Sequence, residues 1–460
     1  MATSAKHRQF NNSQRKHILL VTNHGCHSPR ITVTTDTGGQ NFYVNEYAYA
    51  LVNLGYKVTI INRGGYRHPV TKSLHKGIIY YDNTWDRGGQ HCRLIYLQDG
   101  QSRLIPKEKI KKSNLIKESD FFTKLAANIS FDLAKIFFIN SHYWDGGVLG
   151  ELIVKTIKKQ HRIKTPHLWT PHSLGKLKQA NYKKAKLSVI KKLNFPSRIR
   201  FEEAVIATVN GVVCTSNQIR QTFKHYQSKP KHYFWFPPGI EAWKYKPRRL
   251  NQCADAITLI GKMLAIPRQK IITLIKQGVF FLEISRTSRT KRKDIVLKAF
   301  SQMKNIERAW LIMTINREKN TYRQIMDLCR HLPHRDRIVL INKYLPEKTI
   351  TQLYSLANVY VTASRMEGWG MAVQQAAASN TAIISSKYVP YVNEVLKERA
   401  IIVKDHQPIN YAETMDRLIT EPALRRKMAH LSYRLTTEKY SWRSLSKKFI
   451  TNMSDKRIIR

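Results

Sequence analysis

The sequence predicts an α/β fold made of two doubly wound domains of similar size, each built around a parallel sheet. Short apolar, β-branched runs alternate with longer amphipathic segments, and this alternation occurs twice along the 460 residues. Such alternation is typical of βαβ units, in which helices cover both faces of a parallel sheet. A Pro-Pro-Gly sequence at 237–239 interrupts the pattern between the two sets and indicates a domain junction.

The first half of the chain contains strand-like runs separated by helical patterns. The expected strands are His17–Thr22, Lys57–Asn62, Leu94–Leu97, Phe137–Ser141, Pro166–Thr170, Gly211–Thr215 and His232–Phe236. The expected helices include Gly39–Leu54, Phe121–Phe131, Val148–Gln160 and Arg198–Thr208. In the first of these helices, the apolar residues recur on one helical face.

The second half repeats this arrangement. Its expected strands are Val279–Ser285, Ala309–Thr314, Arg337–Ile341, Val359–Val361, Ala382–Ser385 and Ile401–Val403. Its expected helices are Ile295–Met303, Thr321–Leu332, Glu347–Ala357, Met371–Ala378 and Tyr411–Glu421. Ligands of such domains bind beyond the carboxyl ends of the strands, and two facing domains would form an interdomain cleft.

The domain boundaries follow from the breaks in these patterns. We expect a basic leader at 1–16, a first domain at 17–240, a connector with some helix at 241–277 and a second domain at 278–435. A C-terminal helix at 436–460 is expected to pack back on the first domain.

Composition excludes several classes of protein. A hydrophobic fraction of 42% is enough to fill real cores, which argues against wholesale disorder. The apolar runs, such as 279–285, are far shorter than the roughly 20 residues needed to span a bilayer, and no apolar segment near the start indicates a secretory signal. The five cysteines are far apart and form no CxxC motif, so we expect neither a disulfide framework nor a zinc ribbon. These features favour a cytoplasmic protein.

The net charge is extreme, at +48 from 79 Lys and Arg against 31 Asp and Glu. The stretch 152–201 alone contains 14 Lys and Arg and no acid. Such a surface attracts nucleic acid, anionic lipid or phosphorylated small molecules. The excess also occurs in almost every other segment, however, so a general basic drift explains it equally well. Both interpretations remain open at this point.

Two groups of residues are placed to bind an anionic ligand. Gly38 and Gly39 precede the helical pattern at 41–58, and free N–H groups at a helix N-terminus favour an anion. Arg286 follows a strand and Lys291 lies near the next helix start, which suits a diphosphate clamp. Alternatively, the two glycines form an ordinary turn, and the two cations are part of a generally basic surface. Neither GxGxxG nor GxxxxGK[ST] follows the first strand, which argues against a dinucleotide-dependent dehydrogenase and a P-loop NTPase.

Further polar residues follow strand ends. Glu367 precedes two glycines and a helix, where a carboxylate could accept hydrogen bonds from ligand hydroxyls. His172 also follows a strand, and cations near it in sequence could neutralise a phosphate: Lys176, Lys178, Arg198 and Arg200. A lone histidine is more often structural than catalytic. The pair His24 and His27 has poor spacing for a metal, and no adjacent carboxylate supports one.

Taken in this order, the segments resemble the retaining GT-B glycosyltransferases of family 4, group 1, in particular the sucrose-phosphate synthase and sucrose synthase branch. The matching motifs are DTGGQNFYVNEYAYAL at 36–51, HYWDGG at 142–147, TPHSLGKLK at 170–178, RIRFEE at 198–203, PPG at 237–239, the Arg286 and Lys291 pair, EGWG at 367–370 and YSW at 440–442. The resemblance implies the GT-B fold, with two Rossmann-like domains facing across an interdomain cleft.

The resemblance also implies roles for individual residues. The catalytic set would be His172, Arg286, Lys291 and Glu367. The donor-binding set would be Gly38, Gly39, Gly368, Trp369, Gly370 and Gln375. The acceptor-binding set would be Gln40, Lys107, Tyr143, Lys178, Arg198 and Arg200. No metal or other cofactor is implied, and the anomeric configuration of the transferred sugar would be retained.

Two departures from the family pattern concern the donor. Gln375 stands where the family has a glutamate that meets the nucleotide ribose, and an amide is neutral. The segment 386–396 replaces a Gly-Gly sequence near the donor sugar. Both leave the donor nucleotide and hexose open.

The expected function is therefore transfer of a hexose from a nucleoside diphosphate sugar, UDP-glucose being favoured, to fructose 6-phosphate or a similar sugar phosphate. One alternative is a family 4 enzyme that acts on a lipid-linked or cell-envelope glycan with peripheral contact to an anionic membrane, which the basic stretch 155–200 supports. A lesser alternative is a catalytically degenerate polyanion-binding protein. No specific nucleic-acid partner is expected, because no recognisable RNA-binding module is present.

Overall fold

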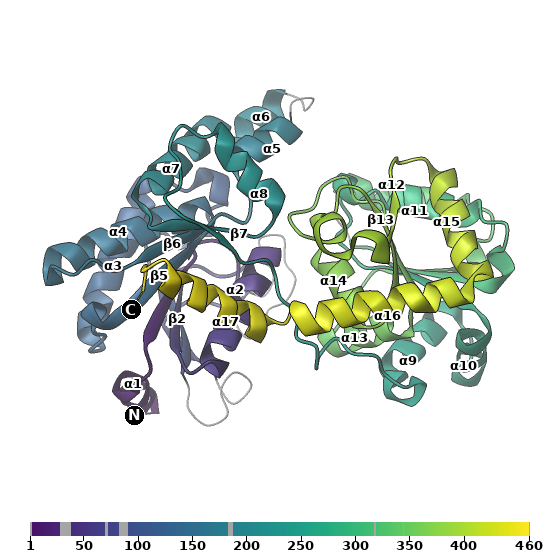
Figure 1. Ribbon diagram of the computed structural model, residues 1–460, viewed down its shortest axis with the longest axis horizontal. Helices are drawn as coiled ribbons and strands as arrows, with labels where there is room; N and C mark the ends of the chain where they lie inside the picture. The colour runs from purple at the N-terminus through teal and green to yellow at the C-terminus, as the bar shows by residue number, and fades with distance from the viewer. Residues whose placement is uncertain are drawn as a thin grey trace. The chain divides into compact units, whose positions relative to one another are not determined.

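The computed structural model describes residues 2–27, 38–69, 72–81, 91–182, 187–316, 319–343 and 345–459, and the chain divides into two compact units (Figure 1). Unit 1 comprises Met1–Gly239 and Trp442–Arg460, and unit 2 comprises Ile240–Ser441. The chain thus returns to unit 1 for its last helix, α17 (Trp442–Asp455), which packs on α2 (Gly39–Asn53).

Unit 1 contains an eight-stranded sheet in the order β3-β4-β2-β1-β5-β6-β7-β8 (Figure 1). The strands are β1 (His17–Val21), β2 (Lys57–Arg63), β3 (Ile78–Tyr80), β4 (Cys92–Leu97), β5 (Ile136–His142), β6 (His167–Thr170), β7 (Gly211–Cys214) and β8 (Tyr233–Trp235). All neighbours pair in parallel except β3 and β4, which are antiparallel. The predicted parallel sheet is confirmed. The short edge strand β3 was not predicted, because its three residues are only half-buried and show no alternation.

The helices of unit 1 lie on both faces of this sheet. Besides α2 and α17 they are α1 (Ala2–Asn12), α3 (Lys112–Asn128), α4 (Tyr143–His161), α5 (Gly175–Asn181), α6 (Leu187–Leu193), α7 (Phe195–Thr208) and α8 (Asn217–Thr222). Helix α3 packs on α4, and α4 packs on α7. Successive crossovers reverse direction between β1 and β5, so the topological switch point, where ligands of such sheets bind, lies between these two strands.

The first residues, expected to form a basic leader, are a folded part of unit 1. Phe10 of α1 is fully buried, and the guanidinium of Arg93 lies 4.0 Å from the centre of its ring. Asn11 donates a hydrogen bond to the carbonyl of Ile129 over 2.8 Å. Arg93 itself is fully buried in β4, which begins before the expected start at Leu94 because α1 covers this charged residue.

Unit 2 contains a six-stranded sheet in the order β11-β10-β9-β12-β13-β14, and every pair is parallel. Its strands are β9 (Val279–Glu283), β10 (Ala309–Thr314), β11 (Ile338–Ile341), β12 (Val359–Thr362), β13 (Ala382–Ser386) and β14 (Ile401–Val403). Its helices are α9 (Ala254–Leu264), α10 (Arg268–Gln277), α11 (Lys293–Ser301), α12 (Lys319–Arg330), α13 (Glu347–Leu356), α14 (Met371–Ala378), α15 (Pro408–Thr420) and α16 (Pro422–Lys439). Here the switch point lies between β9 and β12.

The segment expected to be a connector, 241–277, forms helices α9 and α10 of unit 2. Ile257 and Ile260 of α9 are fully buried, and α9 packs on α13. The amide of Gln352 accepts a hydrogen bond from the backbone N–H of Ala256 over 3.0 Å. These contacts integrate α9 into the second unit.

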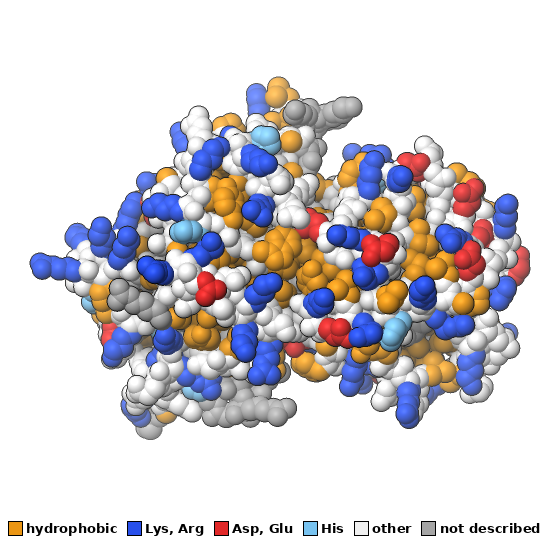
Figure 2. Space-filling view, in the orientation of Figure 1, with side chains coloured by type: hydrophobic (Ala, Val, Ile, Leu, Met, Phe, Trp, Pro, Cys, Tyr) orange, Lys and Arg blue, Asp and Glu red, His pale blue; other side chains and the backbone are white. Residues whose placement is uncertain are grey.

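On the visible face of the molecule (Figure 2), positive charge is spread over both units rather than gathered in one place. Figure 2 shows Lys and Arg side chains across the visible face of both units, with few acidic side chains between them. Among the described residues, no helix is long and apolar enough to cross a membrane.

Candidate active site

The switch point of unit 1 holds a cluster of one phenol and two cations, which we call the tyrosine cluster (Tyr143, Lys178 and Arg198). Tyr143 opens α4 directly after β5 and is almost fully buried. Its phenol oxygen accepts hydrogen bonds from Arg198 Nη1 at 2.7 Å and from Lys178 Nζ at 2.9 Å. Burial alone would raise the pKa of Tyr143, but the charges of Arg198, Lys178 and Lys107 lower it overall. The site therefore stabilises negative charge at this oxygen.

The guanidinium of Arg198 is fixed by a buried acid. Glu202, one helical turn along α7, accepts a hydrogen bond from Arg198 Nε over 2.8 Å. The same carboxylate accepts the backbone N–H of Gly175, the first residue of α5, at 2.9 Å, and it accepts the hydroxyl of Tyr226. Glu202 therefore orients Arg198 and anchors the segment that carries Lys178.

Lys107 joins the tyrosine cluster in one narrow pocket. That pocket is lined by Lys107, Glu108, Ile110, Tyr143, Trp144, Lys178, Leu193, Asn194, Phe195, Ser197 and Arg198. Four of the six predicted acceptor residues are thus brought together. Arg200 is not among them, because it points from the exposed side of α7.

His172 lies close to this cluster in the fold, after β6. Its backbone is left-handed, with φ of 53°, and its ring packs edge-on against Tyr43 with 4.8 Å between centres. Its Nε2 is 3.0 Å from Nδ1 of His142. Burial, with the nearby histidines His24 and His27, lowers the pKa of His172 to about 3, so its ring is neutral at neutral pH. A neutral imidazole can hydrogen-bond a sugar hydroxyl without adding charge.

The start of α2 adjoins the loop after β1. Gly38 has an extended backbone, and its N–H donates to the side chain of Asn41 over 3.0 Å. Gly25 has φ of 79°, and a Cβ at this position would overlap the Asn41 amide, so only glycine fits. Gly39 begins α2, and Nε2 of Gln40 is buried with no hydrogen-bond partner among the described residues. Asp36 and Thr37 of the DTGGQ motif lie outside the described residues.

The switch point of unit 2 holds an ion pair between Lys291 and Glu367, the lysine–glutamate pair. Lys291 follows β9, and Glu367 follows β12. Ser364 donates its hydroxyl to Glu367 over 3.1 Å, and the N–H of Arg365 donates to the carbonyl of Thr290 over 2.7 Å, which ties the two loops together. The predicted partner cation, Arg286, is exposed on the same loop as Lys291.

The loop after Glu367 leads into α14. Gly368 is exposed, whereas Trp369 is buried and donates its indole N–H to Gln374 over 3.1 Å. Gly370 has φ of 108°, and a Cβ there would collide with Val389, so this position requires glycine. The loop therefore holds the open N-terminus of α14 beside Glu367.

Gln375 bridges two tyrosines. Its amide oxygen accepts the hydroxyl of Tyr354 at 3.1 Å, and its amide nitrogen donates to Tyr245 at 3.0 Å. An amide supplies both a donor and an acceptor to this pair, which a carboxylate cannot do. The departure from the family pattern thus has a local physical explanation.

Several residues of these sites were not predicted. His142 and Glu202 lie within the HYWDGG and RIRFEE motifs, and the i, i+4 spacing of Arg198 and Glu202 on a helix was a usable signal. His24 pairs with Asp145 over 2.8 Å and its ring lies 4.6 Å from that of Tyr143. In the part of the chain that the structure describes, no three His, Cys, Asp or Glu side chains approach as a metal-binding group.

Comparison with known proteins bears on both units. A family model described as glycosyl transferases group 1 matches residues 267–434, and one described as Glycosyltransferase Family 4 matches residues 37–243. Mannosylfructose-phosphate synthase of Agrobacterium fabrum is 28% identical over 386 residues, covering 79% of this chain and 74% of that protein. A probable sucrose-phosphate synthase of Thermosipho melanesiensis is 22% identical over 463 residues, covering 93% of each.

Solved structures show the same fold. Sucrose-phosphate synthase from Thermosynechococcus elongatus matches with a TM-score of 0.73 and 22% identity, covering 96% of this chain and 99% of that one. Anabaena HepE, solved with UDP and glucose, matches with a TM-score of 0.66 and 11% identity, covering 96% and 100%. The GT-B fold predicted from the motifs is confirmed.

Proposed function

Because the chain belongs to the group 1 glycosyltransferases of family 4, we propose that it transfers a hexosyl group from a nucleoside diphosphate sugar to a sugar phosphate. UDP-glucose is the favoured donor and fructose 6-phosphate, or a similar sugar phosphate, the favoured acceptor. Two relatives are named as synthases of disaccharide phosphates, which supports this choice of acceptor class.

The observation that most supports a phosphorylated acceptor is the tyrosine cluster. Lys178, Arg198 and Lys107 line one pocket, and together they lower the pKa of Tyr143. A pocket that already favours negative charge is suited to a phosphate dianion, which Lys178 and Lys107 can approach as cations. Free fructose carries no anionic group to pair with Lys178, which, among the described residues, donates only to the phenol of Tyr143.

In unit 2, the donor is proposed to lie at the loops that carry Arg286, Lys291 and Glu367. As the bond between the anomeric carbon and the diphosphate breaks, negative charge develops on the leaving group, and the two cations stabilise this charge. Glu367 would accept hydrogen bonds from hydroxyls of the transferred sugar, and neutral His172 would hydrogen-bond a sugar hydroxyl without adding charge.

The proposed reaction retains configuration and needs no metal. The acceptor hydroxyl forms its bond to the anomeric carbon on the face from which the diphosphate leaves, and its proton passes to a departing phosphate oxygen. The cations at 286 and 291 would take the place that a divalent metal holds in other transferases.

Mass spectrometry of products tests this proposal directly. Purified protein is incubated with UDP-, ADP- and GDP-sugars together with fructose 6-phosphate, fructose or a mixed sugar-phosphate pool. A disaccharide phosphate formed only with phosphorylated acceptors is the expected result. Transfer to free fructose at a similar rate would contradict the role given to the tyrosine cluster, and no consumption of any nucleotide sugar would contradict the activity itself.

A further inference from the structure

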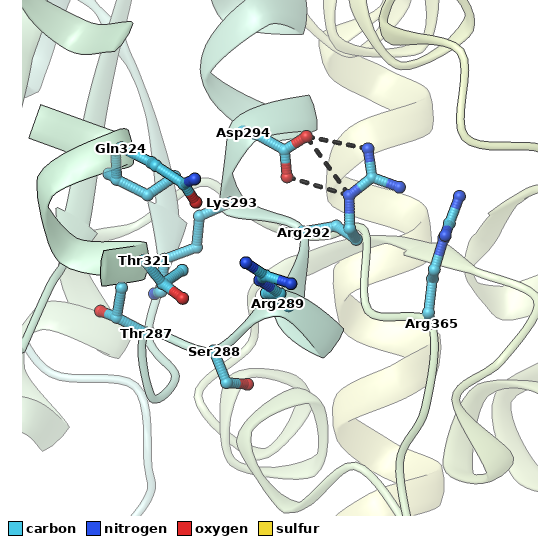
Figure 3. Close-up of a pocket in the computed structure, with 10 residues that line it drawn as sticks. Thr287, Ser288, Arg289, Arg292, Lys293, Asp294, Thr321, Gln324 and Arg365 are labelled. Carbon is cyan, nitrogen blue, oxygen red and sulfur yellow. Dashed lines mark hydrogen bonds and ion pairs between the residues drawn. The ribbon is translucent and has the colours of Figure 1, made fainter. Parts of the chain in front are cut away.

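A pocket in unit 2 lies beside the donor loop but shares none of the residues assigned to donor binding. It has a volume of about 370 Å³ and is lined by Thr287, Ser288, Arg289, Arg292, Lys293, Asp294, Thr321, Gln324, Ile325 and Arg365 (Figure 3). This volume lies within the range of small-molecule sites, roughly 300–1,000 Å³. Arg286, Lys291 and Glu367 are absent from the lining.

The charge of this pocket is unbalanced. Three arginines line it against one acid, Asp294, which binds Arg292 through Nε at 3.0 Å and Nη2 at 2.8 Å. Lys293 is already neutralised, because it is buried and paired with Glu283. In the described part of the chain, no hydrogen bond or ion pair reaches the side chain of Arg289 or of Arg365.

The lining also offers neutral polar groups. In Figure 3, Arg289 lies between Thr321 and Arg292, and the side chains of Thr321 and Gln324 point toward it. The hydroxyl of Ser288 instead lies 2.9 Å from that of Thr290. Thr287 is held firmly, since its N–H donates to Asn316 at 2.6 Å and its hydroxyl accepts the N–H of Asn316 at 2.9 Å.

We propose that this pocket binds a small phosphorylated molecule, its phosphoryl group held between Arg289, Arg292 and Arg365 and the rest of the ligand placed against Thr321 and Gln324. Guanidinium groups match phosphate oxygens in charge and geometry, and a dianion offsets the repulsion among like charges. A pocket of this size takes one small molecule rather than a polymer. The proposal does not depend on the reaction assigned to the chain, since it concerns a separate set of residues.

A backbone hydrogen bond connects the proposed pocket to the loops that carry the lysine–glutamate pair. Arg365 bonds Thr290 through its N–H, and Lys291 and Glu367 follow these residues by one and two positions. A ligand that restricts the motion of the arginine side chains therefore also restricts the two loops that carry Lys291 and Glu367.

The test measures binding and its location without any assay of activity. Calorimetry with inorganic phosphate, pyrophosphate and glucose 6-phosphate is performed on the full chain, on Arg289→Gln/Arg365→Gln and on the control Lys298→Gln/Arg323→Gln. The control removes two exposed positive charges from α11 and α12 outside the pocket. Amide exchange then reports whether ligand protects 319–330 of α12, a segment that carries none of the donor residues.

We expect binding to weaken at least about tenfold in the pocket variant, since charge-assisted hydrogen bonds to two arginines are lost, while the control stays within about twofold. Protection of 319–330 should disappear in the pocket variant alone. Preference for glucose 6-phosphate over the inorganic ions would assign a sugar phosphate, and equal binding would assign the phosphoryl group as the sole determinant. The proposal is overturned if none of the three probes binds, if both variants lose affinity equally, or if 319–330 gains no protection.

Discussion

Arg198 donates a hydrogen bond to the phenol oxygen of Tyr143 over 2.7 Å while its Nε is held by Glu202 at 2.8 Å. One guanidinium thus joins a buried acid to an oxygen that lies open to the pocket shared with Lys107 and Lys178. The buried acid fixes the direction of the guanidinium before any ligand arrives. Pre-orientation of this kind reduces the entropy lost on binding.

The first prediction concerns this cluster. Lys178→Met should raise KM for the sugar phosphate about tenfold or more, because one charge-assisted hydrogen bond to phosphate is lost. KM for the donor should change little. Lys191→Met, an exposed lysine of α6, is the matched control. Steady-state kinetics with each substrate varied in turn gives the answer, and an unchanged acceptor KM would remove Lys178 from the acceptor site.

A second prediction concerns the lysine–glutamate pair. Lys291→Met should lower kcat by about 100-fold or more, since a fixed charge no longer stabilises the departing diphosphate. Glu367→Gln should lower it as well, because the hydrogen-bond pattern offered to the sugar changes. Lys276→Met on α10 is the control for loss of an exposed lysine from the same unit. Circular dichroism should show all three folded, and near-normal turnover in either site variant would refute this assignment.

Much of this site follows from local patterns. Positions after strand ends are readable from sequence, and the family resemblance implied that Tyr143, Lys178 and Arg198 belong to one acceptor site. Residue spacing on a helix could have added Glu202. The same periodicity predicted most strand positions closely, and α14 matches its expected bounds of Met371–Ala378. Helix α3 (Lys112–Asn128), in contrast, begins well before its expected start at Phe121.

What could not be read from the sequence depends on tertiary contacts. Arg93 is charged yet fully buried beneath α1, so neither the start of β4 nor the folded state of the first residues was visible in the pattern. Likewise the role of Gln375 depends on two tyrosines, Tyr245 and Tyr354, that lie 130 and 21 residues away in sequence. Only the fold brings such groups together.

The third prediction concerns Gln375. Gln375→Glu restores the carboxylate typical of the family, which can accept both hydroxyls of a ribose, and should lower the donor KM about threefold to tenfold. It also removes the donor to Tyr245, whose hydroxyl must then turn and donate instead. Equilibrium binding of UDP measures the effect apart from turnover. Weaker UDP binding in the variant would show that the hydrogen bonds to the two tyrosines, rather than contact with the nucleotide, require glutamine at this position.

The fourth prediction concerns acid stability. Burial lowers the pKa of His27, His167 and His172 to about 3, and it lowers those of His17 and His142 well below the usual value. Between the folded value near 3 and the unfolded value of 6.5, the unfolded chain binds more protons than the folded one. The free energy of unfolding of unit 1 should therefore fall as pH drops below about 6.5.

Each such histidine contributes at most about 1.4 kcal/mol per pH unit. Urea unfolding at pH 7, 6 and 5 measures how the free energy of unfolding changes with pH. His167→Gln should reduce this slope by the contribution of one histidine. Glutamine can keep the hydrogen bond to Ser141, which is 2.8 Å long in the native chain. The exposed His225→Gln serves as the control and should keep the wild-type slope. A stability that stays flat from pH 7 to 5 would contradict burial of these rings in the neutral form.

The last prediction concerns the glycine that begins α14. Gly370→Ala must place a Cβ against Val389 at φ of 108°, so the variant meets both a steric clash and backbone strain. Gly55→Ala is the matched control, because Gly55 also has positive φ, at 91°, but nothing lies near its Cβ position. We expect Gly55→Ala to cost about 1 kcal/mol and Gly370→Ala about 2–4 kcal/mol, since the second must also displace a packed side chain. Combining Gly370→Ala with the smaller Val389→Ala should recover the part of the lost stability that is due to the clash. The part that is due to the positive φ should remain. Val389 is fully buried, so Val389→Ala alone is measured as well to correct for the cavity that it creates. Denaturant unfolding of these variants and the native protein then separates the two terms, and equal costs for Gly55→Ala and Gly370→Ala would mean that the clash with Val389 adds no cost.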